Sequence, residues 1–206
     1  MSTVHEVAAL LPDPAELHVH LQALAFLDAL IGGDPLSCEY VFDLDWGPGV
    51  DAALMDNGSG DEFSVSFSPA GVLVRGFDHE SEMSPYGTDD GEVWPGVVDE
   101  VPAVLLPLLH DPAFHDEDIG GVPVTVCLWR ETGDTAWRTG SAIDFPAGRT
   151  DPDGAAHLFR LLTDRSPEFI QAYFEDYYAC RAPLDAVRLV LAGHPLTPAI
   201  MTAFGR

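Results

Sequence analysis

The chain has 206 residues, nine of them basic and 34 acidic, which gives a formal net charge of −25 at pH 7. All nine basic residues are arginine, and without lysine the chain can form neither a Schiff base nor a phosphate-binding P-loop. A chain this negative repels phosphate, so we expect no nucleic-acid partner, and no apolar run approaches the roughly 18 residues that cross a membrane.

The acidity has two explanations that the sequence leaves open. The simpler one is the amino-acid usage of a GC-rich genome, or a saline cytoplasm in which acidic groups keep the protein in solution. The other is a surface shaped to meet a basic protein. The scarcity of lysine, asparagine and isoleucine, whose codons are rich in A and T, favours the first explanation.

The length indicates a single α+β domain over residues 1–206, with a sheet-rich part at 38–145 and a helical part at 151–206. The first residues carry no basic segment of the kind that begins a secretory signal, so a cytoplasmic location is expected. Cys38, Cys127 and Cys180 are odd in number and far apart, which argues against a disulfide framework and against a cysteine zinc site.

The first predicted element is a helix from 14 to 31. Asp13 is a suitable N-cap, Pro14 fits the first helical position, and leucines then recur at every third or fourth position until two glycines end the helix. His18 and His20 point to different faces of this helix. We therefore expect them to be solvated and not to form a ligand pair.

The middle of the chain reads as an antiparallel sheet of about six strands. Four of these follow one another through short turns rich in Gly, Pro, Asn and Asp, which predicts a meander. Two more form a hairpin later in the chain, after a long irregular segment and a short helix at 102–110. The six predicted strands span 39–46, 50–55, 62–67, 72–77, 123–130 and 135–143.

The last third of the chain is predicted to be helical. One helix spans 155–162, a second runs from its cap at Ser166 to about 180, a third occupies 183–193, and a short one follows Thr197. The expected fold is therefore α+β: an N-terminal helix, a mainly antiparallel sheet and a C-terminal helical cluster packed on one face.

One polar stretch stands out, directly after the strand at 72–77. Asp, His and Glu are the residue types that bind metals and carry out acid–base chemistry, and a strand end can present them together. The candidate site residues are Arg75, Asp78, His79, Glu80 and Ser81. A metal held by the weak candidates Asp78, His79 and Glu80 would need further ligands, for which His110, His115 and Asp116 are available.

A purely structural explanation of this stretch stays open. Asp78 could cap a turn, His79 could donate to a backbone carbonyl, and Glu80 could pair with Arg75 or be solvated. No known metal signature and no G-x-S-x-G nucleophile motif is present, and Cys127 lies inside a predicted strand, where a thiol is inert packing. We therefore assign no catalytic residues and expect no cofactor.

Several short motifs together carry a resemblance. The runs 56–61 (DNGSGD), 75–81 (RGFDHES), 83–86 (MSPY) and 126–130 (VCLWR) resemble a family of uncharacterised bacterial proteins with a GFDHES-type motif. The similarity extends over most of the chain from Tyr40 onward. It implies no assigned activity and no catalytic residues, but it marks the central stretch as the hallmark of the family.

These observations favour a non-enzymatic protein, although they leave the question of an enzyme open. The leading hypothesis is a cytoplasmic, acidic interaction protein, such as an immunity-like inhibitor of a basic partner. The alternative is a metal-assisted hydrolase that uses Asp78, His79 and Glu80. A third possibility is a structural module in which the motif only fixes the loop at 78–96. The sequence does not indicate an oligomeric state.

Overall fold

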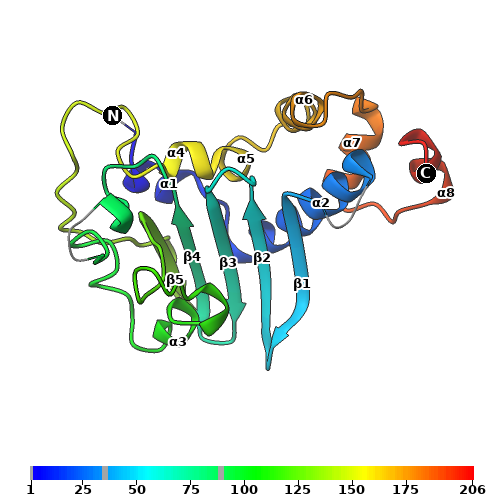
Figure 1. Ribbon diagram of the computed structural model, residues 1–206. Helices are drawn as coiled ribbons and strands as arrows, with labels where there is room; N and C mark the ends of the chain where they lie inside the picture. Colours follow the sequence, from blue (N-terminus) through cyan, green and yellow to red (C-terminus); the bar gives the residue numbers. More distant parts are fainter. Residues whose placement is uncertain (1, 34–36, 88–90) are drawn as a thin grey trace.

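A five-stranded antiparallel sheet forms the centre of the protein (Figure 1). The computed structural model describes residues 2–33, 37–87 and 91–206. The strands follow each other in chain order across the sheet, so the predicted meander is confirmed. Their bounds are β1 Tyr40–Gly47, β2 Val50–Asp56, β3 Glu62–Ser68, β4 Gly71–Phe77 and β5 Val126–Glu131.

Helices precede and follow the sheet in the chain, as an α+β fold requires (Figure 1). The helices are α1 Val4–Leu10, α2 Pro14–Gly32, α3 Leu106–Leu109, α4 Ala155–Leu158, α5 Arg160–Thr163, α6 Pro167–Tyr177, α7 Leu184–Leu191 and α8 Pro198–Ala203. Two short 3-10 turns, η1 Pro85–Gly87 and η2 Pro112–Phe114, lie between β4 and β5. None of the helices in the described ranges combines the length and apolarity that crossing a membrane requires.

The larger hydrophobic core lies between one face of the sheet and the helices. Helix α2 begins where the Asp13 carboxylate accepts hydrogen bonds from Ala15 N and Glu16 N, both at 3.1 Å. Its leucine stripe is buried against sheet residues such as Phe63 and Val74, and the C-terminal helices α4 to α8 add their apolar residues to the same core. The predicted helical cluster on one face of the sheet is therefore confirmed.

A second, smaller core covers the opposite face of β4 and β5. Leu73 and Trp129 project from these strands into a group of apolar side chains supplied by the segment between 83 and 124, including Met83 and Leu105. Strand β4 is consequently buried along its whole length, on both faces. Gly76 allows this, because a Cβ atom there would lie 2.7 Å from Val126 Cγ1 and 2.9 Å from Leu158 Cδ1.

The predicted sixth strand does not form. In the described residues, the segment 135–143 shares only an isolated bridge between Trp129 and Arg138 with β5. Beyond that bridge the Thr139 hydroxyl donates to Cys127 O at 2.8 Å, and Gly140 approaches the backbone of Gly96. The Thr139 hydrogen bond still holds the segment to β5, and the segment leaves the sheet edge at Gly140, which packs against the backbone of Gly96.

Several predicted helices have different bounds in the structure. The helix expected at 102–110 is reduced to α3, since Pro107 lies in its first turn and proline cannot continue a helix from a preceding turn. The helix expected at 155–162 is broken at Phe159 into α4 and α5. Ser166 is the N-cap residue of α6 as predicted, but its hydroxyl donates to Asp164 Oδ1 and makes no cap hydrogen bond to the helix. Helix α1 was not predicted.

The expectation that both histidines of α2 are solvated is wrong. His20 is buried, and its Nε2 lies 2.8 Å from Leu161 O in α5. His18 is partly buried between the rings of Phe42 and Phe67, with Nε2 2.8 Å from Asp51 Oδ2 in β2. Both side chains connect α2 to neighbouring elements, which a helix pattern alone does not reveal.

Candidate functional site

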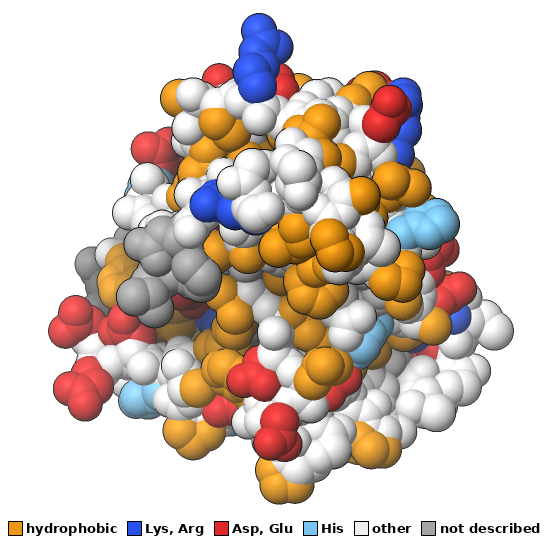
Figure 2. Space-filling model, turned by 90° about the vertical axis from the view of Figure 1, so that its right-hand side faces the viewer, with side chains coloured by type: hydrophobic (Ala, Val, Ile, Leu, Met, Phe, Trp, Pro, Cys, Tyr) orange, Lys and Arg blue, Asp and Glu red, His pale blue; other side chains and the backbone are white. Residues whose placement is uncertain are grey.

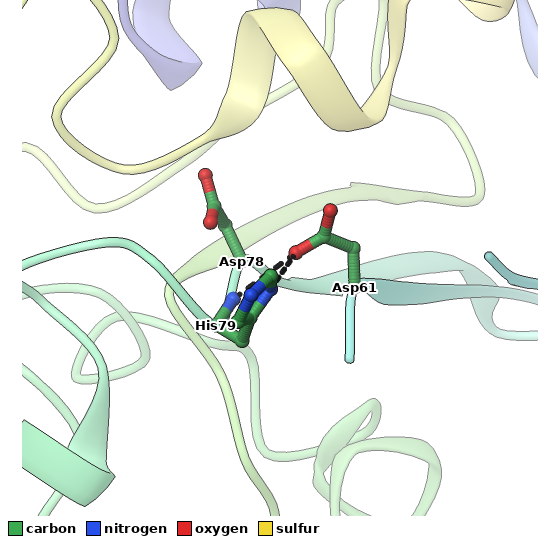
Figure 3. A group of neighbouring side chains, drawn as sticks. All are labelled: Asp61, Asp78 and His79. Carbon is green, nitrogen blue, oxygen red and sulfur yellow. Dashed lines mark hydrogen bonds and ion pairs between the residues drawn. The ribbon is translucent and has the colours of Figure 1, made fainter. Parts of the chain in front are cut away.

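Three segments that are far apart in the sequence meet at one polar pocket. Asp61 ends the turn between β2 and β3, Asp78 and His79 directly follow β4, and His157 belongs to α4. Figure 3 shows Asp61 and His79 in contact, with Asp78 beside them. His79 Nδ1 lies 2.7 Å from Asp61 Oδ1, and His157 Nε2 lies 3.3 Å from Asp61 Oδ2.

The turn between β2 and β3 places Asp61 at the edge of the pocket. Asn57 Oδ1 accepts hydrogen bonds from Ser59 N and Asp61 N, which is the local pairing that asparagine makes in turns. Gly58 and Gly60 have φ of 70° and 102°, a region that favours glycine. Strands β3 and β4 pair with Glu62 opposite Phe77, so Asp61, just before β3, lies near Asp78, just after β4.

Asp61 is the hub of the hydrogen bonds in this pocket, and only 8% of its side chain is exposed. Its carboxylate accepts from His79 N, His79 Nδ1 and Asn57 Nδ2, and it lies within reach of His157 Nε2. Burial opposes ionisation of Asp61, but the hydrogen bonds from His79 and Asn57 prevail and lower its pKa. In turn, the Asp61 carboxylate raises the pKa of His79.

Asp78 forms a turn of its own next to this hub. Its Oδ1 accepts from Glu80 N at 2.9 Å, as the predicted turn cap requires, and burial raises the pKa of this carboxyl. Gly154, with φ of 75°, packs directly against it. A Cβ atom at position 154 would lie 2.3 Å from Asp78 Cβ and 2.4 Å from Oδ2, so this close approach requires glycine.

The pocket encloses about 200 Å³ and its walls are mostly polar. Asp151 forms part of the wall and accepts hydrogen bonds from Ala156 N and His157 N, which holds the first turn of α4. The pocket is lined by Asp61, Asp78, His79, Glu80, Ser81, Glu82, Arg149, Asp151, Pro152 and His157. Four of the five candidate residues predicted from the sequence therefore line one pocket.

Arg75, the fifth candidate, does not belong to this pocket. Its buried guanidinium lies on the opposite face of the sheet, where NH1 donates to Glu62 Oε1 at 2.8 Å and the group stacks over the Phe114 ring. The suggested pair between Arg75 and Glu80 is therefore wrong. The Glu80 side chain is 82% exposed, with Oε1 3.9 Å from His79 Nε2, and His79 Nδ1 bonds to a carboxylate, not to a backbone carbonyl.

The hydroxyl of Ser81 and the thiol of Cys127 are engaged in packing and structural hydrogen bonds. The Ser81 hydroxyl donates to Pro152 O at 2.7 Å and accepts from Met83 N, so it ties two walls of the pocket together. Cys127 is buried in β5, and burial raises its pKa to about 12, as the expectation of inert packing implies.

The further ligands suggested for a metal lie elsewhere. His110 and His115 line a separate pocket with Val93 and Val98, and Asp116 Oδ2 accepts a hydrogen bond from the Tyr86 hydroxyl. The residues that do join Asp78 and His79 are Asp61 and His157. Asp61 could have been found from the turn signal and the strand register, whereas nothing local in the sequence indicates where α4 packs.

No family model matches this chain, and neither a curated protein nor a solved structure matches it. Membership of the bacterial family with the GFDHES-type motif therefore stays a prediction. What the protein does has to be inferred from the contacts, burial and charges of its own residues.

Proposed function

We propose that the protein is a cytoplasmic, acidic binding protein whose partner is a basic protein. The role that fits this best is that of an immunity-like inhibitor, which covers a basic enzyme with a negative surface. The observation that carries the proposal is the net charge of −25 together with the internal use of every cation in the chain. Opposite charge on a partner steers the encounter and speeds association.

All nine arginines contact other groups of the chain, although some of them, such as Arg181 with 94% of its side chain exposed, do so at the surface. Six of them form ion pairs with carboxylates of the chain. The other three, Arg130, Arg160 and Arg206, donate to the backbone carbonyls of Asp134, His157 and Leu30. Within the described residues, most of the carboxylates consequently have no arginine partner, and the field of the molecule is negative.

The edge of the sheet at β1 is the surface that suits a protein partner. In the described residues β1 pairs with β2 on one side and with no strand on the other, so its outer edge is open beyond Tyr40, whose N donates to Asp28 Oδ2. Val41 and Leu44 are 45% and 65% exposed there, next to the exposed Asp43 and Asp45. Figure 2 views the side of the molecule that carries α7, α8 and β1, and it shows hydrophobic side chains in the middle of this face with acidic ones mostly below them. Apolar contact area inside an acidic rim is a suitable arrangement for a basic protein.

The proposal is tested by capture at low salt and reconstitution from pure components. We expect the immobilised protein to retain a basic protein from lysate of its source cells and to release it as the salt concentration rises. The captured protein, once identified and purified, should bind with an association rate that falls steeply with ionic strength. If no basic protein is retained, or if the purified pair does not bind, the proposal is wrong.

Two charge-matched variants locate the surface. Asp45→Lys at the β1 edge and Asp144→Lys in the segment after β5 change the net charge equally, and both positions are exposed. We expect Asp45→Lys to slow association with the captured partner by about tenfold, while Asp144→Lys changes it little. Equal effects of the two substitutions would show that net charge acts without a docking site at β1.

A second candidate function, metal-assisted hydrolysis, is favoured by one observation. Asp61, Asp78 and His79 present possible ligand atoms within 4.8 Å of one another, with Asp61 in the place that the sequence suggested for Glu80. A metal held there would supply an activated water. We expect hydrolysis of p-nitrophenyl phosphate with added Zn²⁺ or Mn²⁺ that His79→Ala removes and His115→Ala retains. Rates no higher than those of metal in buffer would eliminate this candidate.

A further inference from the structure

We propose that Asp61, Asp78 and His79 bind one divalent transition-metal ion, for which Zn²⁺ is the best fit. The inference is independent of the proposed binding to a basic protein. The hydrolase candidate depends on it, but a metal could also serve only to fix the pocket. His157, which reaches Asp61 from α4, would orient the Asp61 carboxylate and would not be a ligand itself.

The geometry of the three side chains fits a small ion. One atom each from Asp61, Asp78 and His79 lies within 4.8 Å of the other two. Two ligands of a tetrahedral zinc ion with bonds of about 2.0–2.1 Å are about 3.3 Å apart, so small side-chain rotations close the set. The contact of 2.7 Å between His79 Nδ1 and Asp61 Oδ1 would open when the metal replaces the shared proton.

The chemistry of the donors selects the kind of metal. An imidazole nitrogen with two carboxylate oxygens suits zinc and similar transition ions, whereas calcium and magnesium prefer sets made of oxygen alone. Three protein ligands leave a fourth position for water, and the pocket of about 200 Å³ around them has room for it. Zinc sites with three protein ligands and a water are typical of catalysis.

The protein already holds the ligands in place. Asn57 Nδ2 donates to Asp61 Oδ2 at 2.8 Å and Glu80 N donates to Asp78 Oδ1 at 2.9 Å, so each carboxylate is held by a hydrogen bond from its own turn. The backbone contributes as well. A Cβ atom at Gly60 would lie 3.2 Å from the His79 ring, and one at Gly154 would collide with Asp78.

The charge of the pocket also favours a cation. Asp61, Asp78 and Asp151 line it together, and the charges of Asp61 and Asp151 oppose ionisation of Asp78. Arg149 is the single arginine in the lining, and its Nε is engaged by Glu82 at 2.9 Å on the exposed side. A divalent ion between Asp61 and Asp78 would neutralise two carboxylates that now repel each other.

The experiment is a zinc titration of the metal-free, full-length protein by calorimetry and by competition with a chromophoric chelator. We expect one Zn²⁺ per chain, and loss of this binding in both His79→Ala and Asp78→Asn. Asp78→Asn keeps a side-chain oxygen that accepts from Glu80 N, so we expect the turn after β4 to form in this variant. Circular dichroism of each variant verifies its fold.

The matched control is His18→Ala. His18 forms a similar histidine–carboxylate pair with Asp51 at 2.8 Å, and these two belong to no group of three possible ligands in the described part of the chain. We expect this variant to bind zinc as the parent does. Absence of stoichiometric binding in the parent, or retention of it in His79→Ala, would overturn the proposal. Zinc binding without hydrolysis would support the site and eliminate only the hydrolase.

Discussion

Replacing Glu62 with alanine is expected to lower the free energy of unfolding by about 3 kcal/mol, because it leaves a buried arginine without its ionic partner. Only 2% of the Arg75 side chain is exposed, and its NH1 lies 2.8 Å from Glu62 Oε1. The remaining acceptors are neutral: Ser64 Oγ at 3.2 Å from Nε and Pro123 O at 3.2 Å from NH1. Burial lowers the pKa of Arg75, and Glu62 opposes this effect.

The measurement is urea denaturation at pH 7 of the parent and three variants. Glu62→Gln keeps an acceptor and should lose less stability than Glu62→Ala. The double variant Glu62→Ala/Arg75→Met removes the stranded charge and fills the space, so it should be more stable than Glu62→Ala alone. A loss below about 0.5 kcal/mol in Glu62→Ala, the range of ordinary surface substitutions, would show that Arg75 does not depend on this pair.

This result would assign a structural role to the first residue of the RGFDHES motif. Arg75 stacks on Phe114 at 4.1 Å and donates to Pro123 O. It therefore attaches the η2 segment and the chain before β5 to the face of the sheet that the smaller core covers. Asp78 and His79 serve the pocket at the end of β4. One short motif therefore contributes to two separate features of the protein.

The parts of the fold that local signals determine could be predicted. Helix α2 has a cap, a stripe of leucines and terminal glycines, and the meander from β1 to β4 has alternating strands and strong turn residues. The predicted strand at 135–143 failed although its composition suits a strand. Whether a segment joins a sheet depends on the partner at its edge. After the bridge at Arg138, Thr139 still donates to Cys127 O in β5, but Gly140 packs against the backbone of Gly96 and the pairing ends.

The site was predicted only in part for the same reason. Asp78 and His79 follow a strand directly, so their place at the end of the sheet could be inferred from the sequence. The position of Arg75 on the other face follows from strand alternation with Gly76, which faces α4. His157 could not be found, because its contact with Asp61 spans 96 residues and depends on how α4 packs.

A second large effect is expected at Glu39, a buried carboxyl group next to β1. Burial raises its pKa to about 7 from the ordinary value of 4.5, although the hydrogen bond from Tyr173 and the charge of Arg160 oppose the change. The Tyr173 hydroxyl lies 2.5 Å and 2.6 Å from the two carboxylate oxygens. Because the folded state binds the proton more tightly, its stabilising contribution is fully present below pH 4.5 and is lost as the pH rises through about 7.

Substituting glutamine for Glu39 removes this titration while it keeps a carbonyl that accepts from Tyr173. The difference between 4.5 and about 7 corresponds to about 3 kcal/mol of lost stability once the group is ionised. We therefore expect Glu39→Gln to gain about 2 kcal/mol relative to the parent on going from pH 5.5 to pH 8.5. Urea denaturation of both proteins at these two pH values measures the gain directly.

The comparison between the two pH values separates titration of Glu39 from any effect of the glutamine on packing. A packing change shifts the stability of Glu39→Gln relative to the parent equally at pH 5.5 and pH 8.5. Titration of Glu39 instead makes the difference in stability between the two proteins depend on pH. Glu117→Gln provides the control, because Glu117 is exposed and should show no such difference. If Glu39→Gln and the parent lose stability in parallel, Glu39 is ionised throughout this range. The hydrogen bond from Tyr173 and the charge of Arg160 would then outweigh the burial of this carboxylate.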